Sequence, residues 1–121
     1  MTIKRVALIT PPYHSGVVES AGTWLNVGFV YMAGSLRAAG YEVDYYDAMS
    51  LWHKWPEIQA RIKAFKPDVI ATTAYTASIV KALELCDLVK QINPSVVTVL
   101  GNVHAAFCYD EVLQDSHEAV D

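Results

Sequence analysis

Val6-Ala7-Leu8-Ile9 is a short, uninterrupted apolar run close to the start of the chain. Two similar runs of apolar and β-branched residues follow at 69–72 and 96–100. Strands of this composition are buried on both faces, as in parallel sheets that helices cover on both sides. The run at 43–47 differs because polar residues interrupt it, so we expect it at the edge of the sheet. An edge second strand predicts the doubly wound strand order 2-1-3-4-5.

Segments with helical spacing of their apolar residues lie between these runs. We expect helices at 26–39, 56–65, 79–92 and 109–117. In the third segment Ile79, Leu83, Cys86 and Val89 share one stripe, which makes Cys86 a small core residue. Residues 119–121 begin a fifth strand, at which the sequence stops. The pattern therefore predicts an α/β fold, a flavodoxin-like (Rossmann-like) doubly wound parallel sheet with the fifth strand truncated.

The composition narrows the class of protein. The 121 residues, 53% of them hydrophobic, fit one domain with one core. A protein rarely ends where a strand begins, so we interpret 1–121 as one domain cut from a larger protein. The net charge of −4 argues against a nucleic-acid partner, which would require a basic face. The two cysteines form no motif typical of a disulfide framework or a zinc site.

The hydropathy of the chain gives no indication of a membrane protein. No apolar run approaches the roughly 20 residues that span a bilayer. The first residues, 1–5, lead into a short apolar run that Pro11-Pro12 closes, and they lack the features of a signal peptide. We therefore expect a cytoplasmic protein without a membrane span.

Ligands of open α/β sheets bind at the carboxyl ends of the strands, where the strand order reverses. The loops at that edge are 11–24, 48–55, 74–77 and 101–108. The first is long for a strand-to-helix connection, and long loops in compact domains are usually functional. Small residues gather in the last two loops, where they either allow close packing of helix on sheet or leave room for a ligand. Two adjacent loops with the same property favour a ligand.

Several ligand classes lack their usual motif in this chain. No GxGxxG or GxxxxGK[ST] loop follows the first strand, so a dinucleotide or a nucleotide phosphate has no cradle there. The end of that strand, 10–12, carries no acidic pair of the kind that accepts a phosphoryl group. No GxSxG elbow and no Cys/His pair with a third member occur either. We expect no catalysis by the side chains of this chain alone.

Two of the four histidines, His14 and His104, follow strand ends at the ligand edge. Each has two interpretations, a local hydrogen bond or a contact to the ligand. Three aromatic residues belong to the same edge and could shield a flat macrocycle or cap the core; they are Tyr13, Trp24 and Tyr75.

At these residues the chain resembles a known family. The matching segments are 13–16 (Tyr-His-Ser-Gly), Glu19-x-Ala21-Gly22-x-Trp24, Leu36-x-Ala38-Ala39-Gly40-Tyr41, 47–49 (Asp-Ala-Met), 66–68, Thr73-Ala74-x-Thr76 and Val99-Leu100-Gly101-x-Val103-His104. They resemble the amino-terminal domain of the anaerobic magnesium-protoporphyrin IX monomethyl ester cyclases. The segments at strand ends are shared by cobalamin-binding radical-SAM enzymes in general. The chain departs from the family at Asn102, where a second glycine is usual.

The resemblance implies cobalamin as the cofactor, with its nucleotide tail between the first and third strands. The implied cofactor-binding residues are Tyr13, His14, Ser15, Gly16, Trp24, Asp47, Met49, Thr73, Ala74, Tyr75, Thr76, Gly101, Asn102, Val103 and His104. The Asp-x-His-x-x-Gly motif of cobalamin-dependent mutases is absent, so we expect no protein nitrogen on cobalt. The alternative is His14 as the axial ligand of cobalt.

The resemblance also implies a larger parent enzyme. That enzyme would add a C-terminal radical-SAM barrel with S-adenosylmethionine and a [4Fe-4S] cluster, and would close the isocyclic ring of bacteriochlorophyll precursors. Other functions remain open. They are a non-catalytic cobalamin carrier or sensor, a cobalamin-dependent radical-SAM enzyme with another substrate, and a nucleotide- or flavin-binding domain, which would want a phosphate loop that Pro-Pro-Tyr-His does not supply.

Overall fold

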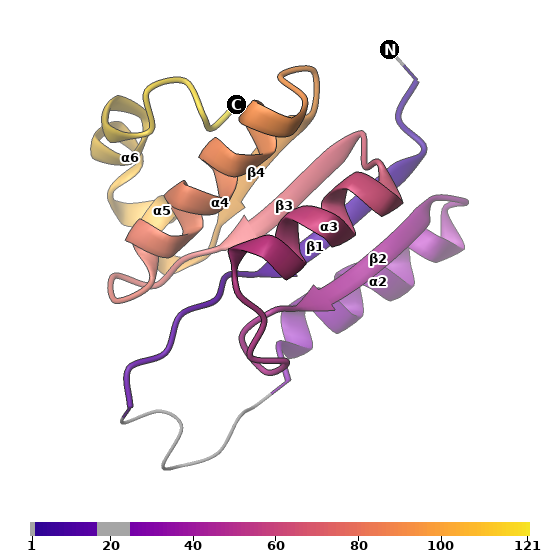
Figure 1. Cartoon of the computed structure of the whole chain (residues 1–121), viewed down its shortest axis with the longest axis horizontal. Helices are drawn as coiled ribbons and strands as arrows, with labels where there is room; N and C mark the ends of the chain where they lie inside the picture. The colour runs from indigo at the N-terminus through magenta and orange to yellow at the C-terminus, as the bar shows by residue number, and fades with distance from the viewer. Residues whose placement is uncertain (1, 17–24) are drawn as a thin grey trace.

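Four parallel strands form one sheet in the computed structural model, which describes residues 2–16 and 25–121. Their order is β2-β1-β3-β4 (Figure 1). The strands are β1 (Arg5–Thr10), β2 (Glu42–Asp47), β3 (Val69–Thr73) and β4 (Val97–Gly101). β2 pairs with β1 at one edge of the sheet, and β1 lies between β2 and β3. The predicted parallel sheet with an edge second strand is confirmed for these four strands.

Both faces of β1 are covered, because alternate residues of a strand point to opposite sides. The run at 96–100 was expected to be buried on both faces as well, but Val99 of β4 is 46% exposed. Val6 and Leu8 of β1 pack against α2 (Val27–Ala38) on one side. Ala7 and Ile9 belong to the core under α3 (Trp55–Phe65) and α4 (Ile79–Ile92) on the other side. Figure 1 shows this arrangement, with α3 and α4 together on one face and α2 on the opposite face. The uninterrupted apolar run of β1 is therefore explained by burial on both faces.

The ends of α2 and α3 follow local chemistry. Asn26 caps α2, since its side-chain Oδ1 accepts a hydrogen bond from Phe29 N at 3.1 Å. Gly40 follows the helix with φ +94°, a conformation that glycine adopts without strain. α3 begins one residue earlier than predicted, at Trp55, and ends at Lys66, which takes the left-handed conformation itself (φ 54°).

The buried stripe of α4 differs from the predicted one. Ala82, Leu85, Cys86 and Val89 are fully buried, whereas Ile79 and Leu83 are only partly buried. The predicted stripe of Ile79, Leu83, Cys86 and Val89 is therefore wrong at its first two positions, where Ala82 and Leu85 are buried instead. Cys86 is a core residue, as expected.

The sequence predicts a loop at 101–108, but the structure has a short helix in this segment. This helix, α5 (Val103–Phe107), starts where Asn102 Oδ1 accepts a hydrogen bond from Val103 N at 2.8 Å. The last helix, α6 (Tyr109–Asp115), ends two residues before the predicted boundary. Both differences arise from local caps, which hydrophobic spacing does not reveal.

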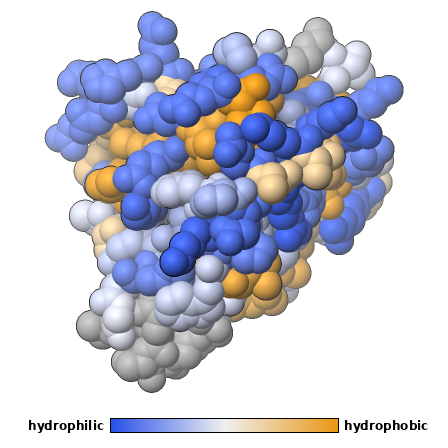
Figure 2. All heavy atoms as spheres, in the orientation of Figure 1, coloured by the Kyte–Doolittle hydropathy of each residue, from blue (hydrophilic) through white to orange (hydrophobic). Residues whose placement is uncertain are grey.

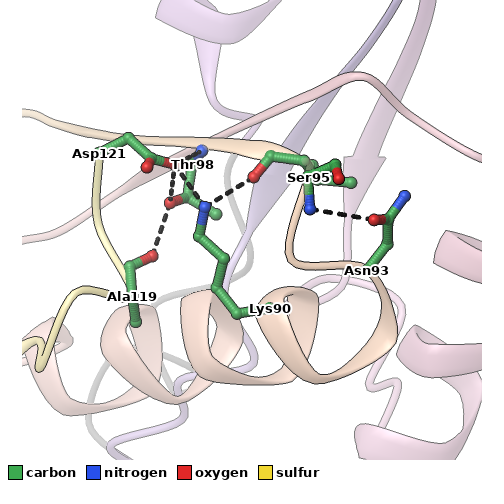
Figure 3. Close-up of polar contacts among 7 residues, drawn as sticks. Lys90, Asn93, Ser95, Thr98, Ala119 and Asp121 are labelled. Carbon is green, nitrogen blue, oxygen red and sulfur yellow. Dashed lines mark hydrogen bonds and ion pairs between the residues drawn. The ribbon is translucent and has the colours of Figure 1, made fainter.

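Residues 119–121 lie beside β4 but are not part of a strand. Asp121 N donates to Thr98 O at 3.0 Å, and Asp121 Oδ2 accepts from Thr98 N at 2.8 Å. Lys90 of α4 reaches the same carboxylate at 2.5 Å. Figure 3 shows Lys90, Thr98, Ala119 and Asp121 converging between α4 and β4. The end of the described chain is thus held against the outer edge of the sheet.

Hydrophilic residues cover most of the outer surface on the face that carries α3 and α4, with hydrophobic atoms visible between them (Figure 2). Within 2–16 and 25–121, the structure has no helix with the length and apolar character needed to cross a membrane.

Candidate functional site

A cavity of about 380 Å³ opens at the carboxyl edge of the sheet. Its walls come from the end of β1, the start of α2, the loop after β2 and the segment between β3 and α4. They are formed by Thr10, Pro11, Tyr13, Leu25, Asn26, Val27, Gly28, Met49, Thr73, Tyr75 and Ser78. This cavity, here called the edge cavity, lies between β1 and β3, the position at which doubly wound sheets bind ligands.

A second cavity of about 310 Å³ continues from the first along the face of the sheet. It lies between α2 and the strands β3 and β4, and we call it the face cavity. Its lining residues are Asn26, Gly28, Phe29, Met32, Ala71, Thr72, Thr73, Val99, Gly101 and Asn102. Asn26, Gly28 and Thr73 line both cavities, so the two are adjacent, and we call them together the recess.

The described walls of this recess are neutral. Within 2–16 and 25–121, neither cavity has an aspartate, glutamate, lysine, arginine or histidine among its lining residues. In the part of the chain that the structure describes, no group of three His, Cys, Asp or Glu side chains could hold a metal ion. Burial raises the pKa of the Cys86 thiol to about 12, which keeps it protonated and unreactive. The recess therefore offers its ligand shape and a few hydroxyl and amide groups, with no charged side chain among the described lining residues.

Gly101 and Asn102 form the floor of the face cavity at the end of β4. A Cβ atom added to Gly101 would have no other atom within 4 Å, so the missing side chain leaves open space. Asn102 has φ 80° and ψ −173°, a region that almost only glycine occupies. Its amide Nδ2 donates to Thr73 Oγ1 at 2.8 Å and thereby joins the ends of β3 and β4. Position 102 thus has a backbone conformation that favours glycine, although the residue there is asparagine.

The loops after β3 and β4 are tied together a second time. His104 Nδ1 and Thr76 Oγ1 lie 3.1 Å apart, within hydrogen-bond distance. Ala74 is fully buried, its N–H donates to Gly101 O at 3.1 Å, and its carbonyl accepts from His104 N at 3.3 Å. The two small-residue loops predicted from the sequence are therefore adjacent, but Ala74 serves their packing and not the surface of a cavity.

His14 lies beside the recess and not inside it. Its Nε2 is 2.9 Å from Met49 O. Because a carbonyl oxygen can only accept, Nε2 is protonated and donates a hydrogen bond to Met49 O. The imidazole stacks on the Trp52 indole with ring centroids 3.9 Å apart and planes 7° apart. Trp52 itself has φ 55°, an unusual conformation for a bulky residue. These contacts hold the loop after β1 against the loop after β2, which places Tyr13 and Met49 in the wall of the edge cavity.

The remaining predicted site residues lie in several places. Asp47 is buried and accepts hydrogen bonds from Ser50 N (3.0 Å) and Ser50 Oγ (2.7 Å), which stabilise the turn after β2. Ser15, Gly16 and Val103 do not line the edge or the face cavity. Trp24 lies outside the described residues. The structure thus brings Tyr13, Met49, Thr73, Tyr75, Gly101 and Asn102 together around the recess.

The structure also adds residues that the sequence analysis did not identify. Thr10, Asn26 and Ser78 supply polar groups to the edge cavity. Phe29, Met32 and Val99 supply apolar walls to the face cavity. Thr10 could have been found as the last residue of the first strand, since that end of a parallel strand faces the ligand edge. Asn26 could have been found as the residue that caps the following helix.

The sequence profile of the B12 binding domain matches residues 13–121 of this chain. Together with the parallel sheet and the recess at its carboxyl edge, this match over most of the chain defines the class of protein. The chain belongs to the B12-binding domain family.

Two of its relatives are named anaerobic magnesium-protoporphyrin IX monomethyl ester cyclase. The protein from Rubrivivax gelatinosus is 41% identical over 113 residues, which are 93% of this chain and 20% of the relative. The protein from Cereibacter sphaeroides is 36% identical over 114 residues, 93% of this chain and 18% of the relative. An uncharacterized methyltransferase of Pyrococcus horikoshii is 29% identical over 108 residues, covering 88% and 23%. The chain spans about a fifth of the length of these relatives.

The fold also matches a solved structure. The cobalamin-dependent S-adenosylmethionine radical enzyme OxsB, with aqua-cobalamin and S-adenosylmethionine bound, gives a TM-score of 0.79 at 17% sequence identity. The match covers 98% of this chain and 16% of OxsB. At this identity the likeness establishes the fold alone. The predicted resemblance to the cobalamin-binding region of radical-SAM enzymes is confirmed.

Proposed function

We propose that this chain binds cobalamin for a radical-SAM enzyme of which it forms one domain. The observation that carries the proposal is its 41% identity, over 93% of its length, to an anaerobic magnesium-protoporphyrin IX monomethyl ester cyclase. That relative is about five times longer, and the rest of such a protein would supply the barrel, the S-adenosylmethionine site and the [4Fe-4S] cluster. In that protein a fifth strand would follow 119–121 and complete the order 2-1-3-4-5.

The recess suits the nucleotide tail of cobalamin. A tail that enters between two strands needs a narrow slot with neutral walls, and the edge and face cavities together form such a slot. Thr10 adds a buried hydroxyl group without a partner in the described residues, which a polar atom of the tail would satisfy. The broad corrin ring would lie over the strand ends, near Tyr75, which is 59% exposed.

For the parent enzyme we propose the oxidative cyclase reaction of bacteriochlorophyll synthesis, in which the isocyclic ring forms without oxygen. The two cyclase relatives support this substrate. Anaerobic assay of the longer protein with magnesium-protoporphyrin IX monomethyl ester tests it directly. A protein that cleaves S-adenosylmethionine but leaves this porphyrin unchanged would contradict the cyclase assignment and keep the cobalamin domain.

A second candidate is a cobalamin-dependent enzyme with another substrate. The observation that favours it is the match to an uncharacterized methyltransferase, which covers 88% of the chain at 29% identity. The same B12-binding domain therefore occurs in proteins of different names, and the domain alone does not determine the substrate.

Titration with hydroxocobalamin, followed by its visible spectrum, tests the cofactor. The chain should take up the cofactor, and Gly101→Leu should abolish uptake because the new side chain fills the face cavity. The fold should survive, since an added Cβ meets no other atom within 4 Å. Gly34→Leu is the matched control, because Gly34 lies on α2 with the same free space but outside both cavities. A folded chain that takes up no cobalamin, or a Gly101→Leu variant that binds as well as the control, would contradict the proposal.

We also propose that His14 does not bind cobalt. Its Nε2 proton is engaged by Met49 O, and the ring is stacked on Trp52, so a ligand role would require both contacts to break. A ligating imidazole normally has a second partner that orients it toward the metal, whereas these partners orient His14 toward the loop after β2. Electron paramagnetic resonance of the cob(II)alamin-loaded chain should give the same spectrum for the native chain and His14→Ala. Loss of a nitrogen hyperfine splitting in the variant would establish His14 as the ligand.

A further inference from the structure

Thr10 is the last residue of β1 and carries a hydroxyl group that lacks a hydrogen bond. The residue is only 8% exposed, and its Oγ1 is withdrawn from solvent with no partner among the described residues. Buried polar groups in proteins are nearly always hydrogen-bonded, because an unpaired one costs free energy. The threonine of the neighbouring strand follows this rule, since Thr72 Oγ1 donates to Ile9 O at 2.8 Å.

The position of Thr10 indicates what its missing partner is. Thr10 forms part of the wall of the edge cavity, where the side chains of Thr73, Asn26 and Ser78 already have partners inside the protein. Thr73 Oγ1 accepts from Asn102, Asn26 Oδ1 accepts from Phe29 N, and Ser78 Oγ accepts from Tyr75 N. Among the described residues of this wall, the serine and threonine hydroxyl groups belong to Thr10, Thr73 and Ser78. Only that of Thr10 has no hydrogen-bond partner in the protein.

We propose that Thr10 is a specificity-determining residue for the nucleotide tail, to which its hydroxyl donates a hydrogen bond. The inference rests on the proposed binding of cobalamin and assigns one contact within that site. The tail carries hydrogen-bond acceptors in its phosphate, its ribose and its base, whereas the corrin ring would lie outside the cavity. A threonine hydroxyl moves between staggered rotamers, so a ligand atom in the cavity can engage it.

The test compares two corrinoids and three forms of the 121-residue chain. Cobinamide lacks the nucleotide tail but keeps the corrin ring, so it reports on every contact except the proposed one. Thr10→Val has the shape of threonine without the hydroxyl, and Thr10→Ser keeps the hydroxyl. We expect Thr10→Val to weaken hydroxocobalamin binding about tenfold, the size of one hydrogen bond. Binding of cobinamide should be unchanged, and Thr10→Ser should bind hydroxocobalamin like the native chain.

The melting temperature of the unliganded chain gives a second, independent readout. Thr10→Val should melt a few degrees higher than the native chain, because it removes an unpaired buried hydroxyl. Thr72→Val is the matched control and should melt lower, since it removes a hydroxyl that donates to Ile9 O. Opposite shifts for the same substitution on adjacent strands would be difficult to explain without the difference in hydrogen bonding.

Two results would overturn the inference. One is equal affinity of the native chain and Thr10→Val for hydroxocobalamin; the other is an equal loss for hydroxocobalamin and cobinamide, which would indicate a general distortion of the site. Failure of the native chain itself to bind either corrinoid would instead contradict the proposed function. The two failures are therefore distinguishable in one set of titrations.

Discussion

Asn102 occupies a backbone conformation in which a Cβ atom is strained. Its φ of 80° with ψ −173° belongs to a region where most residues other than glycine cost about 1–3 kcal/mol. Two hydrogen bonds offset this cost, one from its Nδ2 to Thr73 Oγ1 and one to its Oδ1 from Val103 N. The hydrogen bonds of the Asn102 side chain therefore hold the residue in a backbone conformation that glycine would adopt without strain.

This strain predicts an unusual order of stability for two variants. Asn102→Ala loses both hydrogen bonds and keeps the strained Cβ, whereas Asn102→Gly loses the bonds but relieves the strain. We expect the alanine variant to be less stable than the glycine variant by about 1–3 kcal/mol in urea unfolding. At an ordinary position alanine is the more stable of the two. Equal stability of both variants, or the ordinary order, would contradict the strain.

At this scale the sequence predicts where a residue lies along the sheet edge better than which protein groups its side chain contacts. Thr73, Gly101 and Tyr75 were placed at the cavity because small or aromatic residues at strand ends mark that edge. In the structure Asp47 stabilises a turn and His14 joins two loops, and a contact of either residue with the cofactor stays a prediction. Such partners depend on side-chain orientation, which residue spacing does not determine.

The outer edge of β4 is covered by the residues that follow α6. Asp121 Oδ2 accepts from Thr98 N (2.8 Å), from Thr98 Oγ1 (3.0 Å) and from Lys90 Nζ (2.5 Å), as Figure 3 shows. The Asp121 carboxylate accepts the hydrogen bond from Thr98 N that a backbone carbonyl of a neighbouring strand would otherwise accept. The hydrogen bonds from Lys90 and then from Thr98 lower the pKa of the Asp121 carboxyl below its ordinary value. This element depends on three residues that are distant in sequence.

Removal of that carboxylate should destabilise the chain. Asp121→Ala is expected to lower the free energy of unfolding by about 1 kcal/mol, after allowance for a side chain that is half exposed. Circular dichroism melting measures the effect. Glu84→Ala is the matched control, because it breaks a more exposed ion pair with Lys81 at 2.8 Å and should change stability by less than about 0.5 kcal/mol. Identical melting of both variants would mean that the Asp121 contacts add nothing beyond surface charge.

The elements themselves were largely predictable. Continuous apolar runs predicted β1, β3 and β4, and the polar interruptions of 43–47 predicted the edge position of β2. Helix α5 was missed because its start depends on the Asn102 cap, and its five residues are too few to display a helical period. The buried stripe of α4 differs from the predicted one because several apolar residues of this helix fit a helical spacing, and spacing alone does not show that Ala82 and Leu85 are the buried ones.

Asp68 connects the beginnings of three strands. Its carboxylate accepts hydrogen bonds from Lys4 N at 2.7 Å and from Arg5 N at 2.9 Å. Its backbone N–H donates to Arg5 O, and its carbonyl accepts from Val97 N. The hydrogen bonds from Arg5 N and then Lys4 N lower the pKa of the carboxyl below the ordinary 3.8.

This lowered pKa predicts an acid dependence of the stability of the whole chain. The folded state holds the Asp68 proton less tightly than the unfolded state, so the stabilisation is complete above the unfolded pKa and is lost as pH falls through the folded pKa. Asp68→Asn should therefore lose less melting temperature than the native chain between about pH 5 and about pH 3. Asp87→Asn, on the exposed side of α4, removes the same charge and should behave like the native chain. Parallel curves for all three proteins would contradict a role of Asp68.

The strand order predicts where the candidate site lies, but it does not predict how far the cavity extends along the face of the sheet. A parallel sheet with a reversal between β1 and β3 places a ligand at their carboxyl ends, and the sequence was sufficient for that step. The face cavity lies where Phe29 and Met32 of α2 stand apart from Val99 of β4, so its size depends on the distance between the helix and the sheet. No pattern in the sequence reports such a distance.

The two adjacent cavities are lined by residues from different parts of the chain. All residues that line the edge cavity lie between Thr10 and Ser78, but the face cavity also needs Val99, Gly101 and Asn102. A ribosome makes the chain from its amino terminus. The residues that line the edge cavity therefore emerge from the ribosome before Gly101 and Asn102, which form the floor of the face cavity, have been added. The strand β4 then closes the recess from one side. The face cavity is therefore the last part of the recess to be completed during synthesis, because its floor lies at the end of β4.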